Sequence, residues 1–170
     1  MTETRLLPIA QRGEPILQQR AQEVTGLHEP ALQQLIDAMQ ATMLVANGVG
    51  IAAPQVFVSK RVIIVASRPN PRYPDAPSMQ PLAMVNPEIL WRSTATCLSE
   101  EGCLSVPDVR APVERAERIL VRYLTRTGET QEAQYSGFIA RIIQHECDHL
   151  DGVLFVERVT ADNTQEPARD

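Results

Sequence analysis

Apolar residues recur at helical spacing between residues 30 and 44, and this pattern predicts the first helix of the chain. Pro30 suits the first turn of that helix, and Gly48 follows its end. One face would be continuously apolar, so we expect the helix to pack on a sheet. The residues that form this stripe are Leu32, Leu35, Ile36, Met39, Met43 and Leu44.

Two runs of apolar residues predict strands. The segment 61–67, RVIIVAS, is one, and the segment 81–91, PLAMVNPEILW, contains a second that we expect to end at Pro87. Between them, residues 69–81 include five prolines, which exclude regular structure and predict a surface loop.

Alternating apolar and polar positions in the segment 118–135 predict a β-hairpin. Ile119, Val121 and Tyr123 alternate with other residues before a turn at 127–128, and a weaker return strand reaches Tyr135.

A second helix is predicted from about Gly137 to Leu150. Ser136 is a suitable N-cap, and Gly152 stands just past the end. Because strands precede this helix without regular βαβ alternation, the order favours the α+β class. We therefore expect antiparallel β-sheets packed around a central C-terminal helix, with the other helix near the N-terminus.

Length and charge narrow the class of protein. The 170 residues suit one domain, 1–170, with a core of about 6–157 and a flexible polar tail at 158–170. A formal net charge of −5 leaves no general basic surface, which disfavours nucleic-acid binding. Without a long apolar run or a signal-peptide pattern at residues 1–15, we expect a cytoplasmic protein that does not contact membranes.

The most reactive side chains gather in the second predicted helix, where the segment 144–150 reads QHECDHL. His145 and His149 stand four residues apart on one side, so both imidazoles can bind one metal ion. In helical sites with the pattern His-Glu-x-x-His, the glutamate, here Glu146, handles the proton of a metal-bound water. The pattern also arises by chance in a polar helix, so other residues must decide.

The opposite side of the same helix is apolar and should face the core. Ile139, Ile143, Cys147 and Leu150 share this side. We expect Cys147 to behave as a small buried apolar residue. Asp148 is expected to orient a ligand or to pair with an arginine rather than to act as a base.

A catalytic metal usually takes three protein ligands and keeps one position open. Downstream of the helix, Glu157 and Glu166 are candidates for the third ligand, whereas His28 is expected on the surface. Upstream, Cys103 follows Gly102, and a thiolate is a strong ligand for zinc or ferrous iron. With only three cysteines in the chain, metal ligation or a catalytic thiol is favoured over a disulfide framework.

Three segments together resemble a known family. GVGIAAPQ (48–55), EGCLS (101–105) and QHECDHL (144–150) are similar to the three motifs of the peptide deformylase family, in the same order. The resemblance extends from about Leu6 to Glu157. It implies a metallohydrolase, a formyl-L-methionyl peptide amidohydrolase, that removes the N-formyl group from the initiator methionine of new bacterial polypeptides and releases formate.

The resemblance also implies the catalytic machinery. One divalent metal ion per chain would be Fe²⁺ physiologically, replaceable by Ni²⁺, Co²⁺ or Zn²⁺. Glu146 would protonate the departing amine, while the Gln55 amide and the Leu104 N–H would donate to the developing oxyanion, each donor typically worth about 3–4 kcal/mol. The metal ligands would be Cys103, His145 and His149.

The substrate would contact the same three segments. Gly50 and Ile51 could bind the peptide backbone in extended form, and Ile51 could also line an apolar wall. Phe138 and Ile142, beside the histidines, could line a methionine pocket, although peripheral core packing is the alternative. The remaining candidates are Glu101 and Gly102 against the peptide, Arg110 near its entrance, and Arg115 behind the ligands, paired with Glu101 or Asp148.

Other interpretations stay open at this point. A zincin-type peptidase would leave Cys103 idle, a structural or redox-sensing metal module would lack an open coordination position, and a related enzyme could act on another N-formyl or N-acyl compound. The expected partners are N-formylmethionyl nascent chains. Ribosome contact would be transient, because the short acidic tail lacks the basic C-terminal helix that some bacterial members carry.

Overall fold

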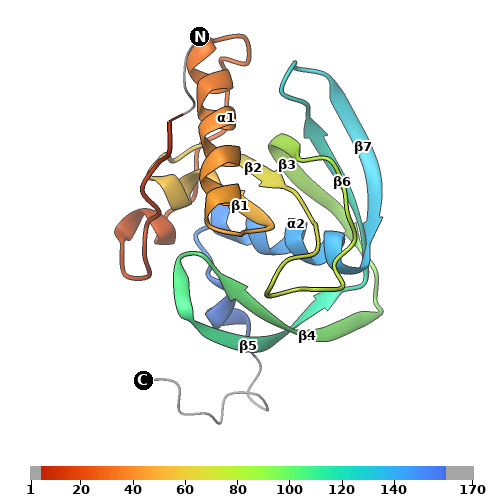
Figure 1. Ribbon diagram of the computed structural model, residues 1–170. Helices are drawn as coiled ribbons and strands as arrows, with labels where there is room; N and C mark the ends of the chain where they lie inside the picture. The colour runs from red at the N-terminus through yellow and green to blue at the C-terminus, as the bar shows by residue number, and fades with distance from the viewer. Residues whose placement is uncertain (1–4, 160–170) are drawn as a thin grey trace.

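The computed structural model describes residues 5–159 and has the α+β architecture that the sequence predicts (Figure 1). All strand pairings within its two sheets are antiparallel. The five-stranded sheet has the order β1-β2-β3-β6-β7, and β4 and β5 form a separate two-stranded sheet. The strands are β1 (Gly50–Ala52), β2 (Val62–Val65), β3 (Leu82–Arg92), β4 (Thr96–Cys103), β5 (Val106–Ala116), β6 (Arg118–Leu124) and β7 (Thr130–Ser136).

Two α-helices and three short 3₁₀ helices complete the described fold. The α-helices are α1 (Pro30–Val45) and α2 (Gly137–Leu150), and both lie where the sequence predicts them. The 3₁₀ helices are η1 (Pro15–Gln18), η2 (Ala53–Val56) and η3 (Phe155–Arg158).

Helix α2 occupies the centre of the molecule, between the five-stranded sheet and the β4–β5 hairpin (Figure 1). Its apolar side packs on the sheet, where Ile143, Cys147 and Leu150 join Ile63 and Met84 in one cluster. Residues 140–150 are all buried, including the polar ones. The predicted apolar face is therefore correct, but the polar face lies against the hairpin rather than in solvent.

The five-stranded sheet separates the two helices, which explains the continuous apolar run in β2. Ile63 and Val65 belong to the cluster with α2, whereas Val62 and Ile64 pack with α1. A strand covered on both faces has no polar side, so alternation disappears from its sequence.

The predicted end of a strand at Pro87 is wrong, because β3 continues through it to Arg92. The register between β3 and β6 shifts between Val85 and Glu88, and Asn86 adopts a left-handed conformation with φ 51°. A β-bulge of this kind accommodates a proline that cannot donate to the ladder.

Two further details differ from the sequence prediction. Ser136 occupies the N-cap position of α2, but its side chain makes no capping hydrogen bond. The β4–β5 hairpin was not predicted, because its strands contain many polar residues and are exposed along much of their length. The proline-rich segment 69–81 does lie outside regular structure.

Neither α1 nor α2 has the length and apolar character needed to cross a membrane, and the same holds for the other helices within residues 5–159. The predicted tail at 158–170 falls almost entirely outside the described residues.

Candidate active site

Cys103, His145 and His149 converge although they come from different elements. Cys103 ends β4, and the two histidines stand one turn apart on α2. One ligand atom from each lies within 4.8 Å of the others, and all three residues are buried. Cys103 Sγ lies 3.3 Å from His149 Nε2. This separation and this set of one sulfur and two nitrogen donors fit a tetrahedral zinc or ferrous site.

Glu101 fixes the orientation of the His145 ring. Its Oε1 lies 2.9 Å from His145 Nδ1, and because an ionised carboxylate only accepts hydrogen bonds, Nδ1 is the donor. The lone pair of His145 is thereby left on Nε2, the atom available to a metal. A carboxylate behind a ligating histidine is a common support of metal sites.

Arg115 and Asp148 extend this support behind the ligands. Arg115 donates to both oxygens of Glu101, at 2.8 and 2.9 Å, and to Asp148 at 2.7 Å. The sequence predicts Glu101 or Asp148 as the partner of Arg115, and the structure contains both pairs. Arg158 of η3 also donates to both Asp148 oxygens, at 3.0 and 3.1 Å.

The charges around Cys103 favour its thiolate. Burial by itself would raise the pKa of the Cys103 thiol, but the interactions of the sulfur with His149 and His145 hold it well below its usual range. Likewise, burial opposes ionisation of Glu101, yet the hydrogen bonds from Arg115 and His145 keep its pKa far below the usual value. The site therefore stabilises an anionic sulfur, which is the form that binds metal.

Glu146 lies beside Cys103, His145 and His149, and within residues 5–159 its carboxylate forms no ion pair with an arginine or lysine. The residue is buried, and its Oε1 has no hydrogen-bond partner among the described residues. Burial raises the pKa of Glu146 to about 7. A carboxyl group that gains and loses its proton near neutral pH is suited to proton transfer.

Gln55 directs its amide toward the ligand sulfur. Its Oε1 accepts from the Ala52 N–H at 2.9 Å, which fixes the side chain from the η2 end of β1. Its Nε2 donates to Ser105 Oγ at 3.0 Å and lies 3.6 Å from Cys103 Sγ. Leu104 follows Cys103 directly, in the turn between β4 and β5.

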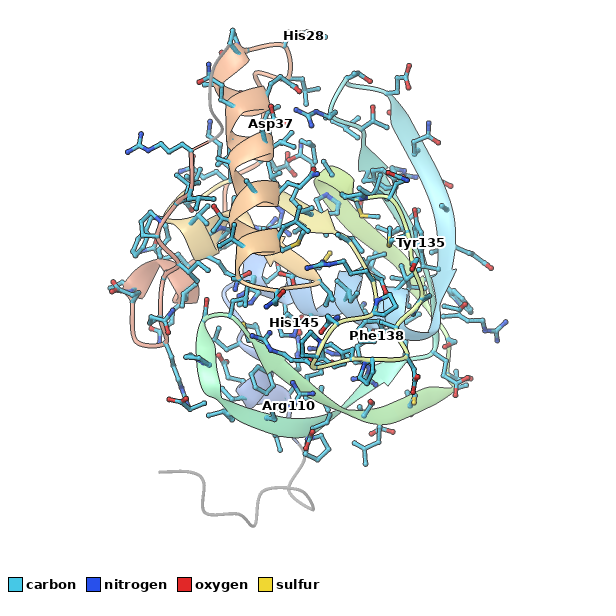
Figure 2. The ribbon with its side chains drawn as sticks, viewed as in Figure 1. His28, Asp37, Arg110, Tyr135, Phe138 and His145 are labelled. Carbon is cyan, nitrogen blue, oxygen red and sulfur yellow. The ribbon has the colours of Figure 1, made fainter. Side chains whose placement is uncertain are left out.

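A pocket opens beside these groups and is lined by all three sequence segments. Phe138 and Ile142 supply apolar side chains from α2, and Gly50 lines it from β1. Figure 2 shows Phe138 near His145 beside the hairpin, with Arg110 below them and His28 far away on the surface, as expected. A Cβ on Gly50 would stand 2.6 Å from Glu146 Oε2, so only glycine allows this close approach.

Two of the residues predicted to bind substrate, Ile51 and Glu101, have side chains that are engaged elsewhere in the structure. The Ile51 side chain is fully buried in the cluster with α1 and does not line the pocket, so only its backbone can serve a substrate. The Glu101 carboxylate is occupied by Arg115, Arg141 and His145.

Of the two downstream acids, Glu157 has another role in the structure. Glu157 accepts from the Leu154 N–H at 3.1 Å and so stabilises the start of η3. Glu166 lies outside the described residues.

The proline-rich loop contributes residues that the sequence analysis missed. Arg72 and Tyr73 line the pocket. The Tyr73 ring contacts Phe138, with centroids 4.8 Å apart, and lies under the Arg110 guanidinium at 5.0 Å. Its hydroxyl accepts from the Gly102 N–H at 3.3 Å. An aromatic residue between prolines was the available signal, but nothing local indicates that the loop reaches α2.

The chain is similar to known proteins over most of its length. Residues 6–165 match the family described as polypeptide deformylase. The chain is 56% identical to "Peptide deformylase 2" of Nostoc sp., covering 91% of this chain and 86% of that protein. It is 52% identical to "Peptide deformylase 2" of Shewanella oneidensis, covering 92% and 86%.

Solved structures of peptide deformylases are also similar to this chain. A Met-Ala-Ser-bound class I type b peptide deformylase from Acinetobacter baumannii has a TM-score of 0.91 and 63% identity, over 92% of this chain and 100% of that one. The peptide deformylase from Thermotoga maritima has a TM-score of 0.82 and 38% identity, over 92% and 99%.

Proposed function

Because the chain belongs to the polypeptide deformylase family, we propose that Cys103, His145 and His149 bind its metal and that the adjoining pocket receives the formylated end of the substrate. The family's reaction is hydrolysis of the formyl amide of N-terminal formylmethionine in newly synthesised polypeptides, and the chain is a metal-dependent enzyme of this type.

The convergence of three distant segments carries the proposal. The ligand atoms of Cys103, His145 and His149 meet within 4.8 Å, and Glu146 and Gln55 border the same pocket. A structural metal module needs neither a buried carboxyl beside its ligands nor an adjoining apolar pocket. A zincin would leave the buried thiolate without a role.

A bound divalent metal would supply Lewis-acid activation of water and of the formyl carbonyl. Glu146 accepts the proton of the attacking water and delivers it to the amine as the C–N bond breaks. Its pKa of about 7 allows both transfers near neutral pH. The products are formate and a free N-terminal amine.

Gln55 and Leu104 stabilise the charge that develops on the formyl oxygen. The Gln55 amide is held in place at its oxygen by the Ala52 N–H, so its NH₂ group is oriented before substrate arrives. The Leu104 N–H is the second donor, next in the chain to Cys103. Preoriented donors of this kind cost no reorganisation during the reaction.

The methionine side chain of the substrate enters between Phe138 and Ile142. Strand β1 is an edge strand, so the backbone of Gly50 and Ile51 can pair with an extended peptide while Gly102 contacts it from the other side. The Met-Ala-Ser ligand of the Acinetobacter enzyme supports a methionine-first peptide as the ligand here. Tyr73 and Arg110 border the exit toward later residues.

We propose Fe²⁺ as the physiological ion, with Ni²⁺, Co²⁺ or Zn²⁺ as replacements, because a thiolate and two imidazoles suit all four. Ferrous iron beside a thiolate is sensitive to oxidation. Activity of the iron form should therefore decay in air faster than that of the nickel form, and equal decay of the two forms would contradict this choice.

We further propose that the enzyme acts in the bacterial cytoplasm on nascent chains, with at most transient contact to the ribosome. Supporting this, the relatives from Nostoc sp. and Shewanella oneidensis are bacterial proteins. The acidic tail that bears on ribosome contact lies outside the described residues, and direct binding to nucleic acid or membrane is not part of the proposal.

Formate release from formyl-Met-Ala-Ser tests the residue assignments. Protein purified without air and loaded with iron or nickel should release formate rapidly, and Glu146→Ala should abolish release while keeping one metal per chain. Cys103→Ser should lose the metal, whereas a zincin would keep it. A wild-type protein that binds metal but releases no formate would point to another N-acyl substrate.

A further inference from the structure

Arg141 is a buried arginine on the same side of α2 as both metal-binding candidates. It stands one turn before His145, and its exposed fraction is 6%. A buried guanidinium is costly unless its donors are satisfied. Its contacts therefore indicate why a charged residue occupies this position.

The Arg141 guanidinium binds both strands of the β4–β5 hairpin. Nη2 donates to the Cys97 carbonyl of β4 at 2.6 Å, and Nη1 donates to the Val113 carbonyl of β5 at 2.9 Å. These are backbone acceptors, so the contact fixes the hairpin itself rather than a single side chain. Since β4 ends at Cys103, Arg141 holds the strand that carries the sulfur against the helix that carries the imidazoles.

The same guanidinium also fixes the carboxylate that orients His145. Arg141 Nη1 donates to Glu101 Oε2 at 2.6 Å, while Glu101 Oε1 lies 2.9 Å from His145 Nδ1. Glu101 thus bridges two successive turns of α2. With Arg115 donating to both oxygens as well, the carboxylate has a partner in each direction and cannot rotate away from His145.

Arg115 and Arg141 support Glu101 in different ways. Arg115 reaches it from β5 and otherwise binds Asp148. Of the two guanidinium groups, only that of Arg141 donates to the backbone of β4, at the Cys97 carbonyl and more weakly, at 3.5 Å, at the Ser99 carbonyl. Loss of Arg141 would loosen the approach of Cys103 to the histidines, whereas loss of Arg115 would leave that link in place.

We propose that Arg141 is a positioning residue that sets the geometry of the metal centre, by fixing Cys103 through β4 and His145 through Glu101. Arg141 also lines the pocket, but in this role it acts through Cys103 and His145. The inference rests on the proposed function, because it takes Cys103, His145 and His149 as the ligands.

Cobalt binding tests the inference without relying on activity. Co²⁺ would be titrated into wild type, Arg141→Lys and Arg141→Gln, and its affinity and thiolate-to-cobalt absorption measured. The matched control is Arg122→Gln, which removes an exposed arginine paired with Glu88 and Glu132. kcat and KM for formyl-Met-Ala-Ser would be measured on the cobalt forms.

Arg141→Lys keeps a positive charge near Glu101 but cannot present the planar fork that reaches four acceptors. Cobalt affinity should fall about ten-fold in the lysine variant and up to about a hundred-fold in the glutamine variant, the range seen when outer partners of metal ligands are removed. The absorption band should shift, and kcat should fall while KM stays near wild type. Arg122→Gln should match wild type in every readout.

Unchanged cobalt affinity and absorption in folded Arg141 variants, even with reduced thermal stability, would overturn the inference and leave Arg141 a structural residue only. Failure of both variants to fold would overturn it too, because Arg141 would then be needed for the fold as such. A wild-type protein lacking thiolate-to-cobalt absorption would instead contradict the proposed ligands, so the two failures are distinguishable.

Discussion

Two cysteines on opposite sides of α2 are buried almost equally yet have opposite acid–base properties. Cys103 is 7% exposed and Cys147 is 8% exposed. Histidines hold the pKa of Cys103 well below the usual value, whereas burial among apolar side chains raises the pKa of Cys147 to about 12. Burial alone therefore does not predict the state of a thiol; the charges that share its environment do.

The comparison extends to the two regions around these thiols. Around Cys103, charged residues from β4, β5 and α2 satisfy one another in a network that reaches from Arg141 to Arg158. On the other side of α2, Cys147 packs in an apolar cluster with the five-stranded sheet, and the charged residues near it, Arg61 and Asp151, lie outside that cluster. The region around Cys103 provides the chemistry, whereas the region around Cys147 holds α2 in place. Substitutions in the first region should therefore mainly reduce activity, and substitutions in the second should mainly reduce stability.

The largest expected effect is that of Cys103→Ala on activity. Removing a proposed ligand should cost more than the about 10–100-fold typical of an outer partner, and the variant should not retain stoichiometric nickel after dialysis. Metal analysis beside formate release measures both. Full nickel retention would show that the thiolate is not a ligand and would break the comparison.

Glu146→Gln should reduce kcat by about 10²–10⁴-fold while the metal stays bound, because the amide cannot carry the proton. In wild type, activity should fall as the pH drops through the pKa of Glu146, which burial raises to about 7 and which a bound metal ion would bring down. A pH–rate profile on the nickel form gives the acid limb. A glutamine variant with wild-type kcat would remove Glu146 from the mechanism.

Ile143→Val tests the apolar region without charge changes. Ile143 is fully buried beside Cys147, and deleting one methylene should reduce the free energy of unfolding by about 0.5–1.5 kcal/mol. Urea unfolding measures this loss, and kcat of the folded variant should stay within about two-fold of wild type. A large fall in kcat at unchanged stability would mean that the two regions are not separable.

Cys147→Ala should have the smallest effect on activity. The unfolded thiol has a pKa near 9.0 and the folded one about 12, so folding favours the neutral form. Its contribution to stability is complete below pH 9 and is lost as the pH rises toward 12. The difference in unfolding free energy between variant and wild type should shrink over that interval, as urea titrations at several pH values would show.

Helical periodicity alone determined much of what matters in α2. A repeat of 3.6 residues places His145 and His149 together and Cys147 opposite them, and the structure agrees. The helix bounds, the hairpin of β6 and β7 and the α+β class follow from local patterns as well. The family resemblance depends on three short segments, and few other families combine these residues in this order.

Only the tertiary structure decided which distant groups meet. Pairing with β6 carries β3 past Pro87 through a bulge, and the polar β4–β5 hairpin is held by α2 rather than by its own pattern. Local sequence likewise gives no sign that Arg141 reaches Glu101 or that Tyr73 reaches Phe138. The periodicity of a segment specifies which residues share a face of one helix or strand. The partners of a buried charged side chain depend instead on how several helices and strands pack together, and no single segment encodes that packing.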